Sequence, residues 1–175
     1  MSTMTSDMIR ARPVTTAALA IALVGAATIV GAWFFQYGLG LKPCPLCLEQ
    51  RYAYYLALPL GALASFAAQR HAPRQLLMTA FMILMLAALA NTWLGGYHAG
   101  VEWKFWPGPT DCSGPLVDFG KAGNLLEQLD KVKVIRCDEV QWRFLGLSLA
   151  GYNVLISLVM AIIALWGFVS AARKA

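Results

Sequence analysis

The sequence predicts an all-α membrane protein, a four-transmembrane antiparallel helix bundle with both termini in the cytoplasm. The first observation is composition: hydrophobic residues make up 59% of the 175 residues and charged residues only 13%, against about 25% charged in ordinary globular proteins. A small soluble domain could not bury that much apolar surface, and a disordered chain would be far more polar. The second observation is that four long stretches of the sequence carry no charge.

Asp, Glu, Lys and Arg are absent from residues 13–41, 52–69, 75–101 and 144–172. A membrane-spanning helix needs about 20 largely apolar residues. We therefore predict spans at residues 14–36, 52–68, 76–96 and 145–170, within a single domain of residues 1–175. A signal peptide is the alternative for the first stretch, but its apolar part is too long and three further stretches follow.

The segments between these spans predict two loops on one side of the membrane, residues 37–51 and 97–144, which would be periplasmic. Gly95 and Gly96 are expected to end the third helix. In the longer loop, Gly123–Lys133 has the apolar spacing of a short amphipathic helix. Asn91 and Asn153 lie within spans and are expected to bond across helices rather than to catalyse.

The net charge of +5 falls on one side of the predicted bundle. The two tails and the segment 69–75 carry six Lys or Arg and one Asp, whereas the two opposite loops carry eight charges of each sign. The positive-inside rule then places both termini in the cytoplasm. The basicity is thus a topology signal, which implies the lipid bilayer as a partner and gives no support for nucleic-acid binding.

All four cysteines fall in the two predicted outer loops: Cys44 and Cys47 in a C-x-x-C, and Cys112 and Cys137 with 24 residues between them. Four cysteines allow three pairings. Two structural disulfides, a zinc site and free buried cysteines are the alternatives. A C-x-x-C bridge restrains little chain entropy, and a four-cysteine zinc site usually needs two short-spaced pairs. The spacing favours a redox couple in an oxidising compartment, with no metal expected.

The neighbours of the C-x-x-C favour a reactive thiol. Cys47 lies about where the second helix begins, so that free N–H groups and the helix dipole favour its thiolate. Arg51 lies four residues later on the same helical face. Its charge would favour that thiolate and could face an anionic ligand, the alternative being an arginine that only reaches for the membrane surface. Glu49 and Gln50 are expected to be solvated.

With these motifs in place, the chain resembles the disulfide bond formation protein B (DsbB) family along nearly its whole length. The matching residues are Lys-Pro-Cys-Pro-Leu-Cys (42–47) with Arg51, Tyr-His-Ala-Gly-Val-Glu-Trp (97–103), Cys112 in a Pro-rich loop, and Cys137 followed by Gln141-Trp142 and Phe144-Leu145-Gly146. The C-x-x-C alone is a weak signal. Its place between the first two helices, with two cysteines between the last two, is specific.

The resemblance implies a quinone-linked thiol oxidase of the bacterial inner membrane that reoxidises a DsbA-like periplasmic thiol oxidase. Cys112 would form the mixed disulfide with the partner, and Cys137 would be its mate in the resting disulfide. Electrons would pass to Cys44 and Cys47, and Cys47 would hand them to ubiquinone or menaquinone from the membrane quinone pool. Arg51 would help to hold the quinone, and His98 lies near the position of the family's quinone-side histidine.

Two other functions compete with this interpretation. Vitamin K epoxide reductase has a similar four-helix core and two cysteine pairs, but its C-x-x-C comes late in the chain, whereas here it comes early. A structural membrane protein with two inert disulfides is the second alternative. The most useful test mixes the purified protein with reduced partner and quinone and follows quinone absorbance. No reduction would favour the structural alternative.

Overall fold

The structure, a computed structural model, describes residues 2–109 and 136–173. The regular elements of the described part are helices apart from two very short strands, which confirms the predicted all-α class. The elements in chain order are α1 (Ser2–Trp33), η1 (Phe34–Gly38, a π-helix), α2 (Pro45–Glu49), α3 (Arg51–Gln69), α4 (Arg74–Glu102), β1 (Arg143–Phe144), β2 (Leu147–Ser148) and α6 (Leu149–Ala172). The predicted amphipathic helix at residues 123–133 lies outside the described residues.

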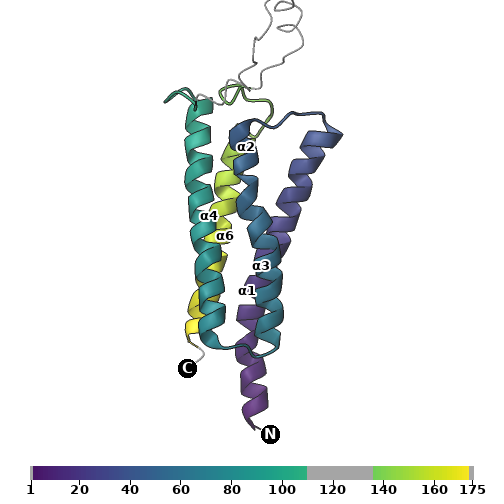
Figure 1. The fold of residues 1–175 in the computed structure, drawn as a ribbon, viewed down its shortest axis with the longest axis vertical. Coiled ribbons are helices and arrows are strands. Elements are labelled where there is room, and N and C mark those ends of the chain that lie inside the picture. The colour runs from purple at the N-terminus through teal and green to yellow at the C-terminus, as the bar shows by residue number, and fades with distance from the viewer. Residues whose placement is uncertain (1, 110–135, 174–175) are drawn as a thin grey trace, which may run out of the picture.

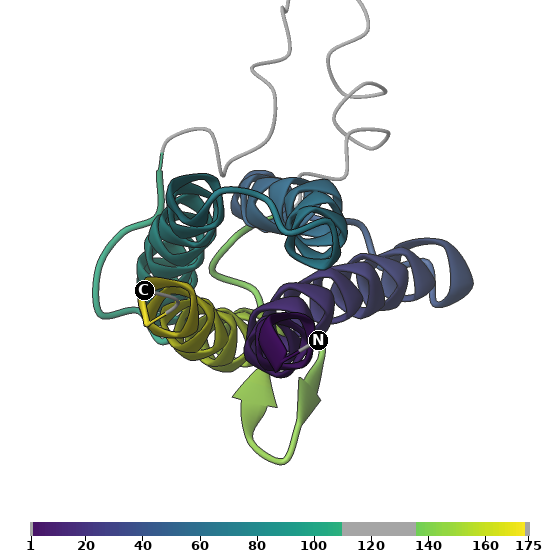
Figure 2. The same ribbon diagram turned by 90° about the horizontal axis from the view of Figure 1, so that it is seen from below.

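The four long helices α1, α3, α4 and α6 run alternately up and down, so that α1 begins and α6 ends at the same end of the bundle (Figure 1). Each packs on two neighbours, α1 on α3 and α6, and α4 on α6 and α3. The helices thus form a closed ring, which the view along the bundle shows (Figure 2). The opposite end carries α2, and we refer to it as the cysteine end.

Three helical segments of the described residues are long and apolar enough to cross a membrane. These are Pro13–Gly38, Arg74–Glu102 and Leu149–Ala172, with mean hydropathies of 2.2, 1.9 and 2.5. Helix α3 occupies the second predicted span but is not among these three. Its sequence carries three tyrosines, Pro59 and a terminal Gln, which lower its hydropathy.

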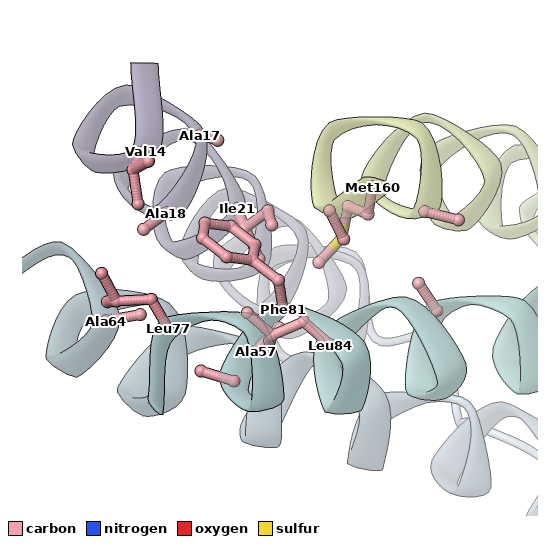
Figure 3. Packing of buried hydrophobic residues seen from close by; sticks show 14 of the residues in the cluster. Val14, Ala17, Ala18, Ile21, Ala57, Ala64, Leu77, Phe81, Leu84 and Met160 are labelled. Atoms are coloured by element: carbon pink, nitrogen blue, oxygen red, sulfur yellow. The ribbon is translucent and has the colours of Figure 1, made fainter. Parts of the chain in front are cut away.

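The core between the helices combines a few large side chains with many alanines. Phe81, Ile21, Leu77 and Val14 are the largest fully buried apolar side chains near the middle and the termini end (Figure 3). The Phe81 ring fills the space left by Gly167, because a Cβ added there would lie 2.2 Å from Phe81 Cε1. Small residues at such contacts let helix backbones approach closely, which is the usual basis of helix packing in membranes.

Three predicted helix ends differ from the structure. Helix α1 begins at Ser2 rather than at residue 14. Helix α4 continues through Gly95 and Gly96 to Glu102, so that residues 97–102 are helical rather than part of a loop. The reason is packing, because a Cβ at Gly95 would lie 2.8 Å from Asn153 Nδ2 and 3.0 Å from Val154 Cγ2. Gly95 therefore serves a close contact with α6 and does not end its helix.

The last helix begins at Leu149, four residues after the predicted start at residue 145. Leu145 and Gly146 have φ values of 48° and 83° and form the turn between the paired strands β1 and β2. Ser148 then caps α6, since its side chain accepts a hydrogen bond from the Gly151 N–H at 3.2 Å. Serine is a preferred residue at a helix N-cap, so the sequence itself indicates a helix start after Ser148.

Candidate dithiol site and its cavity

The C-x-x-C forms its own short helix at the cysteine end. Pro45 is the first residue of α2, where its missing N–H costs nothing. Cys44 is the N-cap residue, and its Sγ accepts a hydrogen bond from the Cys47 N–H at 3.3 Å. Cys47 therefore lies in the first turn of a helix, as predicted, but the helix is α2 rather than the start of α3.

The two thiols form a tightly coupled pair. Both cysteines are free, and the Cys44 thiol donates to Cys47 Sγ over 2.7 Å. This hydrogen bond is the main cause that lowers the pKa of Cys47, and the nearby Arg51 charge lowers it further. The same bond and burial raise the pKa of Cys44 well above its ordinary value. Both directions make Cys44 the thiol that keeps its proton and Cys47 the thiol that ionises more readily.

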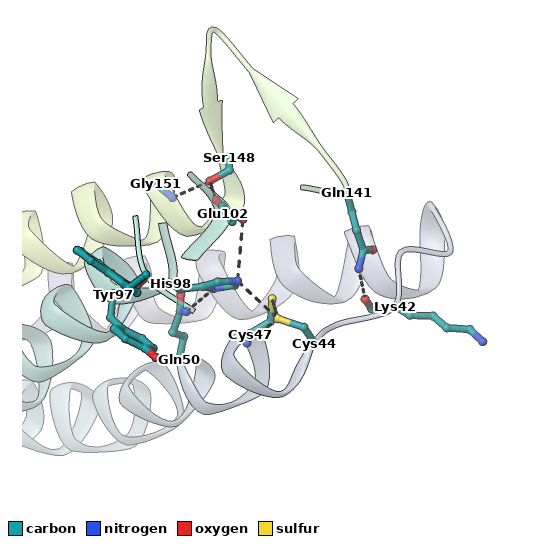
Figure 4. Close-up of polar contacts among 11 residues, drawn as sticks. Lys42, Cys44, Cys47, Gln50, Tyr97, His98, Glu102, Gln141, Ser148 and Gly151 are labelled. Carbon is teal, nitrogen blue, oxygen red and sulfur yellow. Dashed lines mark hydrogen bonds and ion pairs between the residues drawn. The ribbon is translucent and has the colours of Figure 1, made fainter. Parts of the chain in front are cut away.

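His98 lies directly against the thiol pair, on α4 (Figure 4). It is buried, its Nε2 is 3.7 Å from Cys44 Sγ, and its Nδ1 is 2.8 Å from Gln50 Nε2. An amide can present either its NH₂ group or, once turned over, its oxygen. Gln50 can thus hold His98 in either tautomer.

Glu102 lies one helical turn beyond His98 on α4. Its Oε1 is 4.0 Å from His98 Nε2, and both side chains are almost fully buried. The Ser148 hydroxyl donates a hydrogen bond to Glu102 Oε2. The residue that caps α6 thus also holds the carboxyl group in place beside the histidine.

A cavity of about 640 Å³ opens beside Cys47 between α1, α3 and α6. Figure 1 shows that the upper part of α1 leans away from α3 at this level. One end of the cavity is polar and is lined by Cys47, Arg51 and His98, among others. The walls are mainly apolar and come from Val24, Ala27, Ile29, Ala32, Phe35, Leu149 and Ile156.

Arg51 is held at the polar end of this cavity. Its Nη1 donates to Gln36 Oε1 over 2.6 Å, which joins α3 to η1. The Phe35 ring lies 4.8 Å from the Trp142 ring, and both residues line the cavity. The cavity thus combines a cation, a histidine and a thiolate at one end with apolar and aromatic walls. Its volume lies within the range of about 300–1,000 Å³ that is usual for small-molecule sites.

Cys137 lies next to the C-x-x-C although it belongs to the second predicted loop. It is disulfide-bonded, is 2% exposed, and packs in one cluster with Cys44, Leu46 and Val101. Gln141 ties the same segment to the first loop, since its side chain donates to the Lys42 carbonyl at 2.8 Å (Figure 4). Cys112 lies outside the described residues, so that its pairing with Cys137 stays a prediction.

Cys44, Cys47 and His98 also offer three ligand atoms within 4.8 Å of one another, which could hold a metal ion. Two thiolates on one tetrahedral zinc ion lie about 3.8 Å apart, given Zn–S bonds of about 2.3 Å. The separation of 2.7 Å between the two sulfur atoms is much shorter. The arrangement described here is that of two sulfur atoms in close contact, without the spacing of two ligands on one zinc ion.

Comparison with known proteins agrees with this geometry. The family model "Disulfide bond formation protein DsbB" matches residues 14–167. The chain is 31% identical over 163 residues to disulfide bond formation protein B of Azoarcus sp. (strain BH72), covering 85% of this chain and 88% of that protein. It is 31% identical over 157 residues to the protein of the same name from Marinobacter nauticus, covering 82% and 85%.

The chain belongs to the DsbB family. The resemblance inferred from the cysteine motifs is therefore confirmed, and the family's name places its members in disulfide bond formation. Four of the predicted site residues, Cys44, Cys47, Arg51 and His98, meet around one cavity in this member of the family. Their individual roles stay predictions.

Three polar residues of this site were not predicted from the sequence. Gln50 was expected to be solvated, but it is 5% exposed and holds His98. Glu102 has a signal in the sequence, since it is the acid four residues after His98 and ends a charge-free stretch. Ser148 has the signal of a helix cap, but its contact with Glu102 joins α6 to α4 and could be seen only in the structure.

Proposed function

We propose that this chain is a protein-dithiol:quinone oxidoreductase of the bacterial inner membrane. In this proposal it reoxidises a DsbA-like periplasmic thiol oxidase and passes the electrons through its two cysteine pairs to a membrane quinone. The observation that carries it is the position of the free Cys44–Cys47 pair, between the disulfide-bonded Cys137 and the cavity. Membership of the DsbB family supports the same reaction.

The membrane topology belongs to this proposal. Helix α3 would be a fourth span, since it packs alongside α1 and α4 and, as the shortest of the four long helices, needs little tilt to fit the bilayer. Both termini would then be cytoplasmic, as the distribution of Lys and Arg indicates. The cysteine end would face the periplasm, which is the oxidising side.

Electron entry would begin at the loop pair. A thiolate of the reduced partner attacks the Cys112–Cys137 disulfide at Cys112, and the second partner thiol resolves the mixed disulfide, which leaves two loop thiols and an oxidised partner. The loop thiols then reduce a Cys44–Cys47 disulfide by a second exchange. The packing of Cys137 against Cys44 supports this step, since exchange requires direct contact of sulfur atoms.

The cavity residues fit a quinone of either type, ubiquinone or menaquinone. Arg51 and His98 would hold its polar ring beside Cys47, and the apolar walls from α1 and α6 would hold the start of its tail. When bound, the quinone accepts two electrons and two protons. The chain supplies the thiolate at Cys47, positions the ring and excludes water.

The free thiols at Cys44 and Cys47 count against the alternative of two inert structural disulfides. The position of the C-x-x-C between α1 and α3 counts against a vitamin K epoxide reductase, in which the C-x-x-C lies late in the chain.

Quinone absorbance tests the proposal. Purified protein is mixed with a reduced DsbA-like partner and ubiquinone, and the loss of quinone absorbance is followed. We expect wild-type protein and the exposed-carboxyl control Glu49→Gln to turn over, and Cys47→Ser to show no turnover while remaining folded. Normal turnover by Cys47→Ser, or none by the wild type with either quinone, would refute the proposal.

A further inference from the structure

We propose that Glu102 is the second proton donor of the site, delivering a proton through His98 as the Cys44–Cys47 dithiol is oxidised. This inference rests on the proposed function, because that reaction sets the demand for protons. The observation behind it is a buried carboxyl group held 4.0 Å from the same nitrogen of His98 that lies 3.7 Å from Cys44.

When Cys47 is ionised, the thiol pair carries fewer protons than the reduction of a quinone consumes. Reduction of a quinone consumes two electrons and two protons. When Cys47, the acceptor of the Cys44 hydrogen bond, is ionised, the pair supplies both electrons but only the proton on Cys44. A second proton must come from another group at the site.

Glu102 is placed to supply that proton. Its Oε2 accepts from the Ser148 hydroxyl, which leaves Oε1 to carry a proton toward His98 Nε2. Among the described residues, no Lys or Arg forms an ion pair with Glu102 that would hold it as a carboxylate. Gln50 contacts His98 Nδ1 and suits either tautomer, and the Cys137 backbone also bonds the ring. Nε2 faces both Glu102 and Cys44, so that it can take a proton from one side and release it to the other.

The charges at the site support this direction of transfer. An ionised Glu102 opposes the Cys47 thiolate, so by linkage the thiolate favours the protonated carboxyl in the reduced site. Oxidation removes the thiolate charge and lets Glu102 ionise. The balanced step is Cys44–SH, Cys47–S⁻, Glu102–COOH and quinone giving the Cys44–Cys47 disulfide, Glu102–COO⁻ and quinol. One negative charge stays in the site throughout.

Other titratable and charged residues around the cavity also contribute to a measured pH dependence. The titratable and charged residues around the same cavity are Lys42, Cys44, Cys47, Arg51, Tyr54, His98, Arg136, Glu139 and Tyr152, with Arg143 of β1 acting on Glu102 from the second loop. His98 lies against both the Cys44 thiol and Glu102. A change confined to Glu102 therefore reports on this step.

The first test uses neither quinone nor partner. The full chain is equilibrated with dithiol redox buffers across a range of pH, and the redox state of Cys44 and Cys47 is read by alkylation and mass spectrometry. Wild-type protein is expected to take up about two protons per two electrons, one on Cys44 and one on Glu102, whereas Glu102→Gln takes up about one. Glu102→Asp and the exposed control Glu49→Gln should keep the wild-type value. An unchanged proton uptake in Glu102→Gln would overturn the assignment.

The second test needs no variant. The infrared difference spectrum of wild-type protein, reduced minus oxidised, should show a protonated carboxyl group in the reduced form, and absence of that signal would also overturn the assignment. In turnover with quinone, Glu102→Gln is expected to lower kcat by roughly 10²-fold, with partial rescue by Glu102→Asp. A wild type that fails to reduce quinone would refute the proposed function alone, since proton uptake is measured without quinone.

Discussion

At the scale of single residues, one hydrogen bond makes the two thiols of the C-x-x-C differ in how readily they lose a proton. Cys44 donates to Cys47 over 2.7 Å, which keeps the proton on the buried partner and leaves the thiolate on Cys47, beside Arg51 and the cavity. The thiolate is the reactive form of cysteine. Both cysteines line the cavity and both pack with Cys137, so the hydrogen bond rather than position distinguishes the two thiols.

The pH dependence of alkylation tests this division. Because the pKa of Cys47 is lowered, its thiolate should persist to lower pH than that of an ordinary thiol and disappear only as pH falls through the lowered value. Cys44→Ala removes the donor, so the pKa of Cys47 should rise and its alkylation rate at neutral pH should fall roughly tenfold for each unit of the rise. Mass spectrometry of reduced protein treated with iodoacetamide measures this rate.

The unfolded chain serves as the control, since both thiols titrate near the ordinary value there. An alkylation profile of Cys47 that does not change in Cys44→Ala would show that the hydrogen bond does not set its reactivity.

The sequence identified the cysteines, Arg51 and His98 because each has a local pattern: a C-x-x-C, a spacing of four residues, and a family motif. Gln50 has no such pattern, and the spacing of four residues between His98 and Glu102 does not by itself show what Glu102 contacts. Gln50 is turned inward because α2 ends at Glu49 and α3 begins at Arg51, and this break in the helix could not be located from periodicity. One partner of Glu102, Ser148, is the residue that caps another helix, α6.

At the scale of elements, close packing of α4 on α6 positions His98 and Glu102. Next to Gly95 lies a buried polar group in which Asn91 donates to Asn153 Oδ1 at 3.2 Å and Tyr54 donates to the same oxygen at 2.5 Å. This confirms that Asn91 and Asn153 bond across helices. These bonds fix the rotation of α3, α4 and α6 relative to one another.

Two adjacent glycines of α4 allow a matched test of that packing. Gly95→Ala would force its Cβ against Asn153 and Val154, whereas a Cβ at Gly96 meets nothing within 4 Å. We expect Gly95→Ala to lower the free energy of unfolding by about 1–3 kcal/mol. Gly96→Ala should leave it unchanged or raise it by up to about 1 kcal/mol through better helix propensity.

Thermal unfolding in detergent, followed by helical circular dichroism, measures both variants. Equal stability of the two would contradict the close contact of α4 with α6. The sequence suggested that both glycines end the helix, because a Gly-Gly pair carries no information about a neighbour in space.

At the scale of the whole molecule, the bundle brings three segments that are distant in sequence to one end. The C-x-x-C precedes α3, His98 and Glu102 end α4, and Cys137 and Ser148 precede α6. The charge-free stretches predicted the four long helices because helix periodicity and length are local properties. The cavity between α1, α3 and α6 could not be predicted, because it arises from how the helices lean against one another.

The central claim is that the Cys44–Cys47 dithiol delivers its electrons directly to a quinone in this cavity. A single turnover without partner tests it most directly: the chain is reduced, freed of reductant, mixed with ubiquinone and quenched with an alkylating agent. We predict that one Cys44–Cys47 disulfide appears for each quinone reduced, at the same rate. Quinone reduction while Cys44 and Cys47 stay alkylatable, or disulfide formation without loss of quinone, would contradict the account.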